Sequence, residues 1–253
     1  MQYIRYSVGD QIHYGTLEGE TVHRLDGDLF EGRPTSITHA RSEITLLAPC
    51  QPSKVIAIGL NYKSHLGKRP CPEVPGIFAK FPTCIIGPGQ GIEMPPDAMD
   101  LHYEGEMVVV IGKRCKRVSV EEAPEHVFGV TAGNDVSERR WQSGDLQWFR
   151  AKGSDTFGPL GPAITTGLDY GNLLLETRVN GVTRQSQRTS DLLFPVPVLV
   201  SYVSAYMTLL PGDVIYTGTP GTTQAFQPGD VIEVELEGVG VLRNRAVAAA
   251  VSG

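Results

Sequence analysis

The stretch "HYEGEM", residues 102–107, places two glutamates two residues apart, directly before the apolar run "VVVIG". In an extended chain, residues i and i+2 share one face, so Glu104 and Glu106 point the same way, and Val108 and Val110 continue that face inward. Two carboxylates side by side on a half-buried face repel each other and lose hydration. The pair therefore requires a positive counter-charge.

A third carboxylate, Asp135 in "AGNDVSERRWQ", follows an apolar run, at the point where a side chain leaves a strand for a loop or pocket. Three carboxylates without a histidine or cysteine partner suit a hard divalent cation, Mg²⁺ or Mn²⁺, with water and substrate oxygens completing its coordination. In a second interpretation, Glu104 and Glu106 pair with surface lysines on a solvated edge strand. Judged from these residues alone, the second interpretation is the stronger one.

The elements that must position these carboxylates are mostly strands. Short alternating pieces fill the first 50 residues and predict a small β-rich N-terminal domain, residues 1–50, and the two prolines of "APCQPSK" (48–54) mark its boundary. Residues 51–253 then form the main domain. One longer helix is predicted over 195–210, with proline at its start, where proline is tolerated. The fold class predicted is a β-rich α+β body of mixed topology.

Turn motifs divide the strand-rich segments. "VNGV" predicts a tight hairpin, and "PGDVI", which occurs at 211 and again at 228, predicts two type II turns that lead into strands. The tail, "DVIEVELEGVGVLRNRAV", reads as a closing hairpin. The densest basic run, "GKRCKR" (112–117), is interpreted as a solvated hairpin rather than a binding surface.

Composition excludes several classes of function. A net charge of -6 and a pI near 5.5, without a basic stripe or tail, argue against sequence-independent nucleic-acid binding. The four cysteines have no C-x-x-C spacing, which is typical of a reducing compartment and predicts neither a zinc site nor a disulfide framework. Neither a signal peptide nor a run of 18 apolar residues is found, so the protein is expected to be cytoplasmic and not membrane-bound.

From about residue 50 onward the chain resembles the fumarylacetoacetate hydrolase family. The matching pieces keep the family's order and spacing: "GLNYKSH", "GIFAKFPT", "HYEGEMVVVIG", "GVTAGNDVSERRWQ", "RAKGSDTFGPLGP", "LLFPVPVLVSYVSAYMTLLPGDVIYTGTP" and "PGDVIEVELEGVG". The resemblance implies a mixed β-roll core that holds the metal, and a homodimer. The first 50 residues resemble the small extra domain that many members carry.

Carried over position by position, the resemblance assigns roles to individual residues. Glu104, Glu106 and Asp135 match the metal-binding carboxylates, which reverses the preference for a solvated edge strand. Lys152 in "AKGSD" matches the active-site lysine, whose natural task beside a metal is to hold a developing enolate or carboxylate oxygen. Gln142 corresponds to a substrate-orienting glutamine.

Three further residues are expected at the substrate. Thr219 in "TGTP" corresponds to a loop threonine that touches substrate. Lys80 and Arg139 are expected to contact substrate or to pair with the carboxylates.

His65 in "GLNYKSH" matches a histidine in the family's mobile lid that acts as general base in the hydrolytic members, a task that suits an imidazole near neutral pH. Those members carry a glutamate three positions later, which pairs with the histidine. This chain has Lys68 there, and Glu73 lies five residues further on. The departure leaves fold and metal site intact and puts water activation in question.

The resulting prediction is a metal-dependent enzyme acting on a small 2-oxo or 1,3-diketo acid. A metal-bound enolate is common to three reactions: hydrolysis of an acylpyruvate, which is placed first, decarboxylation of a 2-oxo acid such as oxaloacetate, and isomerisation. Because Lys68 replaces the glutamate, hydrolysis leads the other two only modestly. A catalytically silent metal-binding scaffold is the alternative from a different class.

Overall fold

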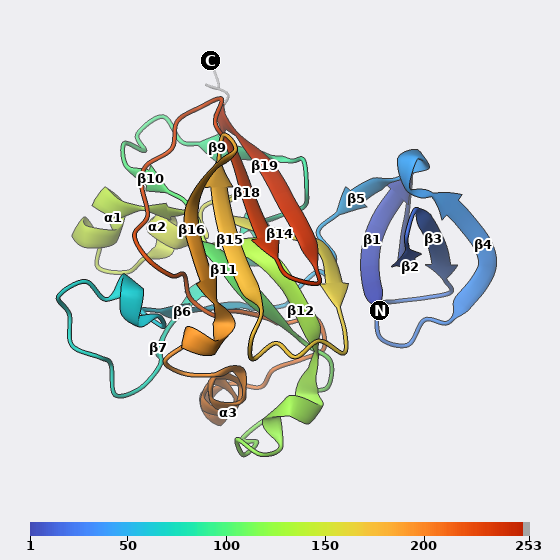
Figure 1. Cartoon of the computed structure of the whole chain (residues 1–253), viewed down its shortest axis with the longest axis horizontal. Helices are drawn as coiled ribbons and strands as arrows, with labels where there is room; N and C mark the ends of the chain where they lie inside the picture. Colours follow the sequence, from blue (N-terminus) through green and yellow to red (C-terminus); the bar gives the residue numbers. More distant parts are fainter. Residues whose placement is uncertain (250–253) are drawn as a thin grey trace.

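The computed structural model describes residues 1–249, and three β-sheets build it (Figure 1). The largest sheet runs in the order β4 (Pro34–Ala40), β3 (Thr21–Leu25), β2 (Gln11–Glu18), β1 (Gln2–Val8), β14 (Gly158–Thr165), β12 (Val127–Asn134), β11 (Gly105–Ile111), β17 (Val214–Tyr216), β6 (Val55–Gly59) and β7 (Gly76–Lys80), with β5 (Thr45–Leu47) beside β1 and β8 (Ile85–Ile86) beside β14. The second sheet runs β16 (Val182–Arg188), β15 (Leu174–Val179), β18 (Val231–Leu236), β19 (Gly240–Ala248) and β9 (Gly91–Met94). The third pairs β10 (Leu101–His102) with β13 (Ser137–Glu138).

Helices are few and short: α1 (Arg139–Gly144), α2 (Phe149–Gly153) and α3 (Val196–Tyr206). Strands account for 44% of the residues and helices for 15%, so the predicted β-rich α+β class is confirmed. Most neighbouring strands are antiparallel, whereas β6 and β17, β8 and β14, and β9 and β19 run parallel, which is the mixed topology expected. Within residues 1–249, no helix is long and apolar enough to cross a membrane.

The predicted turns are confirmed in detail. β15 and β16 form the hairpin of "VNGV", where Asn180 and Gly181 have φ of 52° and 77°, the positive pair that a type I′ turn needs. At the two "PGDVI" sites, Gly212 and Gly229 have φ of 88° and 98°. The Asp213 amide donates to the Leu210 carbonyl and the Asp230 amide to the Gln227 carbonyl, both at 3.0 Å, so these are type II turns that lead into β17 and β18.

Two expectations need correction, and both involve one contact. The helix expected over 195–210 ends at Tyr206, because Met207 is extended and Leu209 forms a backbone bridge with Cys115. The segment "GKRCKR" (112–117) does not form a hairpin of its own: it begins the long irregular loop that joins the antiparallel strands β11 and β12, and its Cys115 is buried against that bridge rather than solvated. Pairing the two buried apolar residues through their backbones thus straightens both segments.

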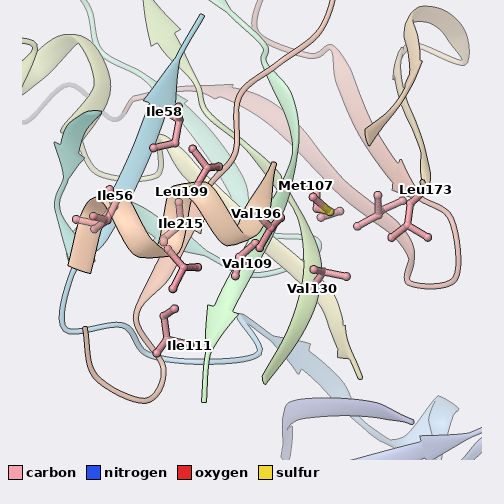
Figure 2. Close-up of a cluster of buried hydrophobic side chains, with 14 of the residues drawn as sticks. Ile56, Ile58, Met107, Val109, Ile111, Val130, Leu173, Val196, Leu199 and Ile215 are labelled. Atoms are coloured by element: carbon pink, nitrogen blue, oxygen red, sulfur yellow. The ribbon is translucent and has the colours of Figure 1, made fainter. Parts of the chain in front are cut away.

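Strand β11, which contains Glu106 and begins directly after Glu104, lies between β12 and β17 in the interior of the large sheet, and all its residues are buried. Met107, Val109 and Ile111 pack on one face with α3 (Figure 2), and Val108 and Val110 pack on the other. The half-buried face expected from the sequence is therefore wrong, because sheet layers and α3 cover β11 on both sides. This burial also excludes the solvated edge strand.

Gly105 is packed so closely that no side chain fits at this position. A Cβ atom built there would lie 1.9 Å from Thr177 Oγ1 on β15, which packs across β11. We expect Gly105→Ala to lower the free energy of unfolding by about 1–3 kcal/mol through overpacking. Urea denaturation of the variant and of wild type measures this difference in the free energy of unfolding.

Two controls accompany that variant. Thr177→Ala removes the clashing hydroxyl, which has no hydrogen-bond partner, and should restore most of the loss. Gly144→Ala, where nothing lies within 4 Å of the added methyl group, should change stability by less than about 0.5 kcal/mol. Equal urea midpoints for Gly105→Ala and wild type would contradict the packing argument.

Candidate metal centre and active-site pocket

The adjacent ends of β11 and β12 bring three buried carboxylates together. Gly105 pairs with Asn134 across the ladder, and beyond this pair the Asp135 amide donates to the Glu104 carbonyl at 2.8 Å. The Glu104 amide donates to Asn134 Oδ1, also at 2.8 Å. One oxygen each from Glu104, Glu106 and Asp135 lies within 4.8 Å of the other two.

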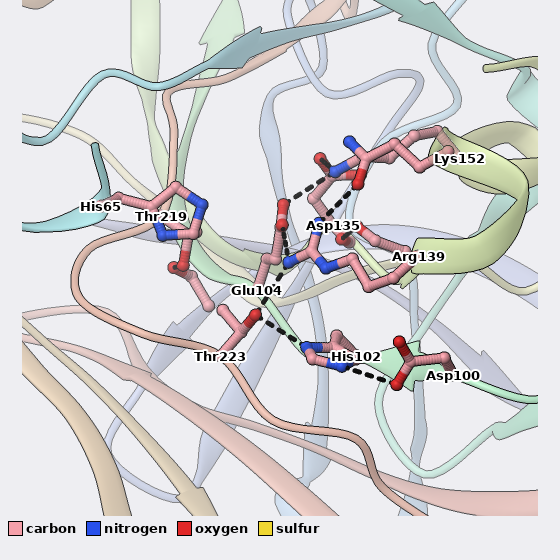
Figure 3. Close-up of polar contacts among 12 residues, drawn as sticks. His65, Asp100, His102, Glu104, Asp135, Arg139, Lys152, Thr219 and Thr223 are labelled. Atoms are coloured by element: carbon pink, nitrogen blue, oxygen red, sulfur yellow. Dashed lines mark hydrogen bonds and ion pairs between the residues drawn. The ribbon is translucent and has the colours of Figure 1, made fainter. Parts of the chain in front are cut away.

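Three cations surround two of these carboxylates (Figure 3). Lys152 Nζ lies 2.8 Å from Glu104 Oε2 and 2.6 Å from Asp135 Oδ2. Arg139 donates to Glu104 Oε1 at 2.5 Å, and Lys80 Nζ lies 2.6 Å from Asp135 Oδ1 and donates to the Lys152 carbonyl. Burial opposes charge on Lys152, but the two carboxylates outweigh it and raise the pKa of Lys152. The amine is therefore an ammonium, a donor and not a base.

Glu104 and Glu106 differ in electrostatics although they are two residues apart. Burial alone would raise the pKa of Glu104, but the Lys152 and Arg139 charges hold it well below the usual range. Burial raises the pKa of Glu106 well above its usual value, and the Asp135 and Glu104 carboxylates raise it further. Glu106 Oε2 accepts one hydrogen bond, from the Gly218 amide at 2.7 Å, and within residues 1–249 no cationic side chain pairs with it.

This imbalance is the test of whether a divalent cation fits. An all-oxygen set of three buried carboxylates is the donor chemistry of Mg²⁺ and Mn²⁺, and the carboxylate without a counter-charge is the one that such a cation would neutralise. The residues present therefore fit the metal expected from the sequence, and Glu104, Glu106 and Asp135 are those that would hold it.

A cavity of about 630 Å³ opens over the carboxylates, a size typical of small-molecule sites. The residues expected at the substrate that line it are His65, Arg139, Gln142, Lys152 and Thr219. Lys80 is not among the lining residues. It lies behind Asp135, so its place is that of a counter-charge rather than a substrate contact. Phe78 and Trp148, with ring centroids 5.1 Å apart, supply an apolar wall.

His65 lies on the 3₁₀ turn Lys63–His65, between β6 and β7, and its Nδ1 is 2.6 Å from the Gly221 carbonyl. A carbonyl oxygen only accepts, so Nδ1 carries the proton and, in the neutral ring, Nε2 keeps its lone pair. The neighbouring Ser64 hydroxyl accepts from the Gly221 amide at 2.9 Å. Lys68 and Glu73 are both exposed and lie outside the cavity lining.

Two other expected residues are already engaged by protein groups. The Gln142 carbonyl oxygen accepts from Arg139 at 2.8 Å, which leaves the amide NH₂ as the group available to a bound oxygen. The Thr219 hydroxyl donates to the Gly105 carbonyl and accepts from Gln185 Nε2, both at 2.8 Å. Thr219 thus lines the cavity while its hydroxyl ties the loop to β11.

Sequence reasoning missed several polar residues around these. Thr223 lines the cavity and accepts from Arg139 at 2.8 Å, and His102 and Asp100 lie behind it. His102 stands in the quoted motif "HYEGEM", which was the available signal. Its partner Thr223 comes from a loop more than a hundred residues away, and no local pattern connects the two.

The contrast between the glutamates gives a prediction for the metal-free protein. We expect Glu106→Gln to raise the free energy of unfolding by roughly 1–3 kcal/mol, because it removes a buried carboxylate without a counter-charge. The pKa of Glu106 is higher in the folded than in the unfolded chain. Wild type therefore loses stability as the pH rises from the unfolded-chain pKa toward the folded-chain pKa, and over this range the difference in free energy of unfolding between Glu106→Gln and wild type should widen. Thermal melting against pH, with and without Mg²⁺, measures both effects.

The matched control is Glu104→Gln, which leaves the buried Lys152 without one of its partners. It should destabilise the protein by about 3–5 kcal/mol. Opposite signs are the expected result; destabilisation by both variants would refute this view of Glu106. Mg²⁺ should stabilise wild type and not Glu106→Gln.

Comparison with known families gives two matches that together span most of the chain. Residues 54–247 match the family described as Fumarylacetoacetate (FAA) hydrolase C-terminal, and residues 1–49 match the domain described as Rv2993c-like, N-terminal. A curated relative, the mitochondrial oxaloacetate tautomerase FAHD2A of Bos taurus, is 42% identical over 222 residues, covering 82% of this chain and 71% of that protein.

Solved structures agree with the sequence matches. A 5-carboxymethyl-2-hydroxymuconate delta-isomerase from Mycobacterium smegmatis superposes with a TM-score of 0.94 at 44% identity, covering 98% of this chain and all of that one. A maleylpyruvate hydrolase from Sphingobium, solved with manganese(II) and pyruvate, gives a TM-score of 0.82 at 27% identity, covering 99% of this chain and all of that one. The chain therefore belongs to the fumarylacetoacetate hydrolase family, whose members are hydrolases, isomerases or tautomerases.

Proposed function

We propose that this protein is a metal-dependent tautomerase or isomerase of small 2-oxo acids, which takes a proton from the carbon beside the oxo group and returns it elsewhere. The observation that carries the proposal is the setting of His65. Its Nδ1 is held by the carbonyl of Gly221, and within residues 1–249 no carboxylate lies at ion-pair distance from its ring.

A single imidazole with a free lone pair is sufficient for proton transfer, because the same group accepts the proton and gives it back. Hydrolysis requires a second group in addition to the base. The base must activate the attacking water, and the second group orients that base and stabilises the positive charge that it acquires. A backbone carbonyl orients the ring but carries no full negative charge. Lys68, in the position where hydrolytic members have glutamate, is exposed and outside the cavity. These features favour proton transfer over the hydrolysis placed first from the sequence.

The other cavity residues suit the enolate that proton removal creates. Mg²⁺ or Mn²⁺, when bound by the three carboxylates, supplies a Lewis acid that polarises the substrate carbonyl. Lys152, kept protonated by Asp135 and Glu104, donates a hydrogen bond to the developing negative oxygen. The Gln142 amide and the Arg139 guanidinium, both lining the cavity, orient the substrate's remaining oxygens.

The relatives support the same choice. The isomerase and the oxaloacetate tautomerase are 44% and 42% identical to this chain, whereas the maleylpyruvate hydrolase is 27% identical. The names of all three relatives describe enzymes of small oxo or hydroxy acids, which is the substrate class proposed here.

The first test follows the ultraviolet absorbance of the enol of oxaloacetate with Mg²⁺ or Mn²⁺ added and removed. We expect metal-dependent loss of the enol above the uncatalysed rate. His65→Gln should lower kcat about 10²- to 10⁴-fold, the usual contribution of a general base, and leave metal affinity unchanged. A metal-loaded sample that accelerates neither this conversion nor any other 2-oxo acid isomerisation would overturn the proposal, as would a His65→Gln variant with wild-type kcat.

Hydrolysis of an acylpyruvate remains the second candidate, because Gly67 and Arg69 on either side of Lys68 do line the cavity. A carboxylate at residue 68 would then lie near the base. We expect Lys68→Glu to raise acylpyruvate hydrolysis at least tenfold from a low wild-type rate and to leave tautomerisation unchanged. Lys63→Glu makes the same charge change on the same segment and serves as control. Wild-type hydrolysis faster than tautomerisation would place the second candidate first, and CO₂ release would point to decarboxylation.

A further inference from the structure

We propose that His102 is a positioning residue for the active site: through the Thr223 hydroxyl it holds Arg139 against Glu104. The proposal rests on the proposed function only in that Glu104 is taken as a metal ligand. His102 belongs to strand β10, two residues before Glu104. It is not among the cavity-lining residues, and its ring lies between Asp100 and the lining residue Thr223 (Figure 3).

Four contacts form one continuous chain of hydrogen bonds. His102 Nε2 lies 3.0 Å from Asp100 Oδ1, and His102 Nδ1 lies 2.9 Å from Thr223 Oγ1. Arg139 Nη2 then lies 2.8 Å from Thr223 Oγ1 and 2.5 Å from Glu104 Oε1. One guanidinium nitrogen thus joins the threonine hydroxyl to a carboxylate of the proposed metal site.

The donors and acceptors in this chain can be ordered in one direction. Arg139 only donates, so Thr223 Oγ1 accepts from it, and the threonine proton is directed to His102 Nδ1. Nδ1 must then be the unprotonated nitrogen, and Nε2 carries the hydrogen that Asp100 accepts. If Nδ1 carried a proton instead, Thr223 Oγ1 would face two donors and its own hydrogen would lose its acceptor in this chain.

The backbone around the chain fixes both of its ends. The Arg139 amide donates to the Asp100 carbonyl at 3.0 Å, and the Phe226 amide donates to the Leu101 carbonyl, also at 3.0 Å. β10 therefore joins the start of α1 to the loop of residues 219–226. The backbone alone does not direct the Thr223 hydroxyl or the Arg139 guanidinium. His102 supplies the acceptor that does, and Asp100 sets its tautomer, as a carboxylate does for a histidine in many sites.

The consequence lies at Glu104. Its two oxygens are divided between Arg139 and Lys152, at 2.5 and 2.8 Å, so the position of Arg139 sets the orientation of the carboxylate. Loss of an outer-shell partner of a metal ligand typically costs 10- to 100-fold in metal affinity or activity. The same range is expected when His102 no longer directs Thr223.

The first experiment reads the tautomer directly. Nitrogen-15 NMR of the histidine rings in the full-length protein, with the His102 signals assigned by their loss in His102→Phe, should show an unprotonated Nδ1 and a protonated Nε2. In Thr223→Val, which removes the hydroxyl at constant shape, the Nδ1 signal should shift. A wild-type Nδ1 that carries the proton, or an unmoved signal in Thr223→Val, overturns the proposal.

The second experiment is a double-mutant cycle on Mn²⁺ affinity, measured by calorimetry without substrate. We expect His102→Phe and Thr223→Val each to weaken Mn²⁺ binding about 10- to 100-fold. The double variant should bind Mn²⁺ no more weakly than the single variant with the lower affinity, because both substitutions break the same chain of hydrogen bonds. Thr223→Ser keeps the hydroxyl and should restore affinity to within about threefold of wild type. The proposal is refuted if the losses of Mn²⁺ affinity in the two single variants multiply in the double variant. It is also refuted if Thr223→Ser binds Mn²⁺ as weakly as Thr223→Val.

These readouts separate the inference from the proposed function. Neither the tautomer nor Mn²⁺ affinity depends on turnover, so failure of every activity assay with both results intact would remove the tautomerase alone. If His102→Phe does not fold, the Thr223→Val and Thr223→Ser pair still decides. In the active enzyme, the same variants should lower kcat/KM at saturating Mn²⁺, because Arg139 also lines the cavity.

Discussion

Three carboxylates buried at the adjacent ends of two strands are the constraint on which this structure depends. Without compensation, their mutual repulsion and lost hydration would prevent the chain from closing. Each of three elements delivers one cation: β7 ends with Lys80, α1 begins with Arg139, and α2 contains Lys152. All three cations pair with Glu104 or Asp135, so Glu106 is left without a direct counter-charge, at the point where we expect a divalent cation.

The position of β11 explains why the site can be held so tightly. A central strand covered on both faces cannot shift without disturbing the core on either side, and Gly105 lets β15 approach to within contact of its backbone. The rigid packing of β11 thus fixes the backbone at both glutamates, and the apolar packing further along the same strand offsets the free-energy cost of burying their carboxylates. The short α1 and α2 bring their cations over this strand end, and the rest of the fold keeps them there.

Features of the fold and site could be predicted from the sequence where they depend on residues close together in the chain, and not where they depend on residues far apart. The alternation of "HYEGEM" placed Glu104 and Glu106 on one side, and turn chemistry at "VNGV" and "PGDVI" located strand ends, because all of these are local. The place of Lys80 behind Asp135 and the engagement of the Thr219 hydroxyl are set by partners 55 and 114 residues away. The burial of β11 on both faces was missed for the same reason: a central strand and a half-buried one begin with similar residues.

The loop of residues 219–223 links the two sides of the chemistry. The Gly221 carbonyl contacts His65, and Thr223 contacts Arg139 beside the carboxylates, so one short segment sets the distance between the residue proposed as the base and the groups proposed to hold the negative charge. The relatives of this chain include an isomerase, a tautomerase and a hydrolase, so membership of the family alone does not choose among these reactions. In this chain the base is oriented by a backbone carbonyl that belongs to the loop. Under the proposed function, a His65 ring without a carboxylate partner within residues 1–249 suffices for proton transfer but lacks the support that water attack requires, so the choice of reaction is assigned to the loop of residues 219–223 and to the segment that carries His65 and Lys68.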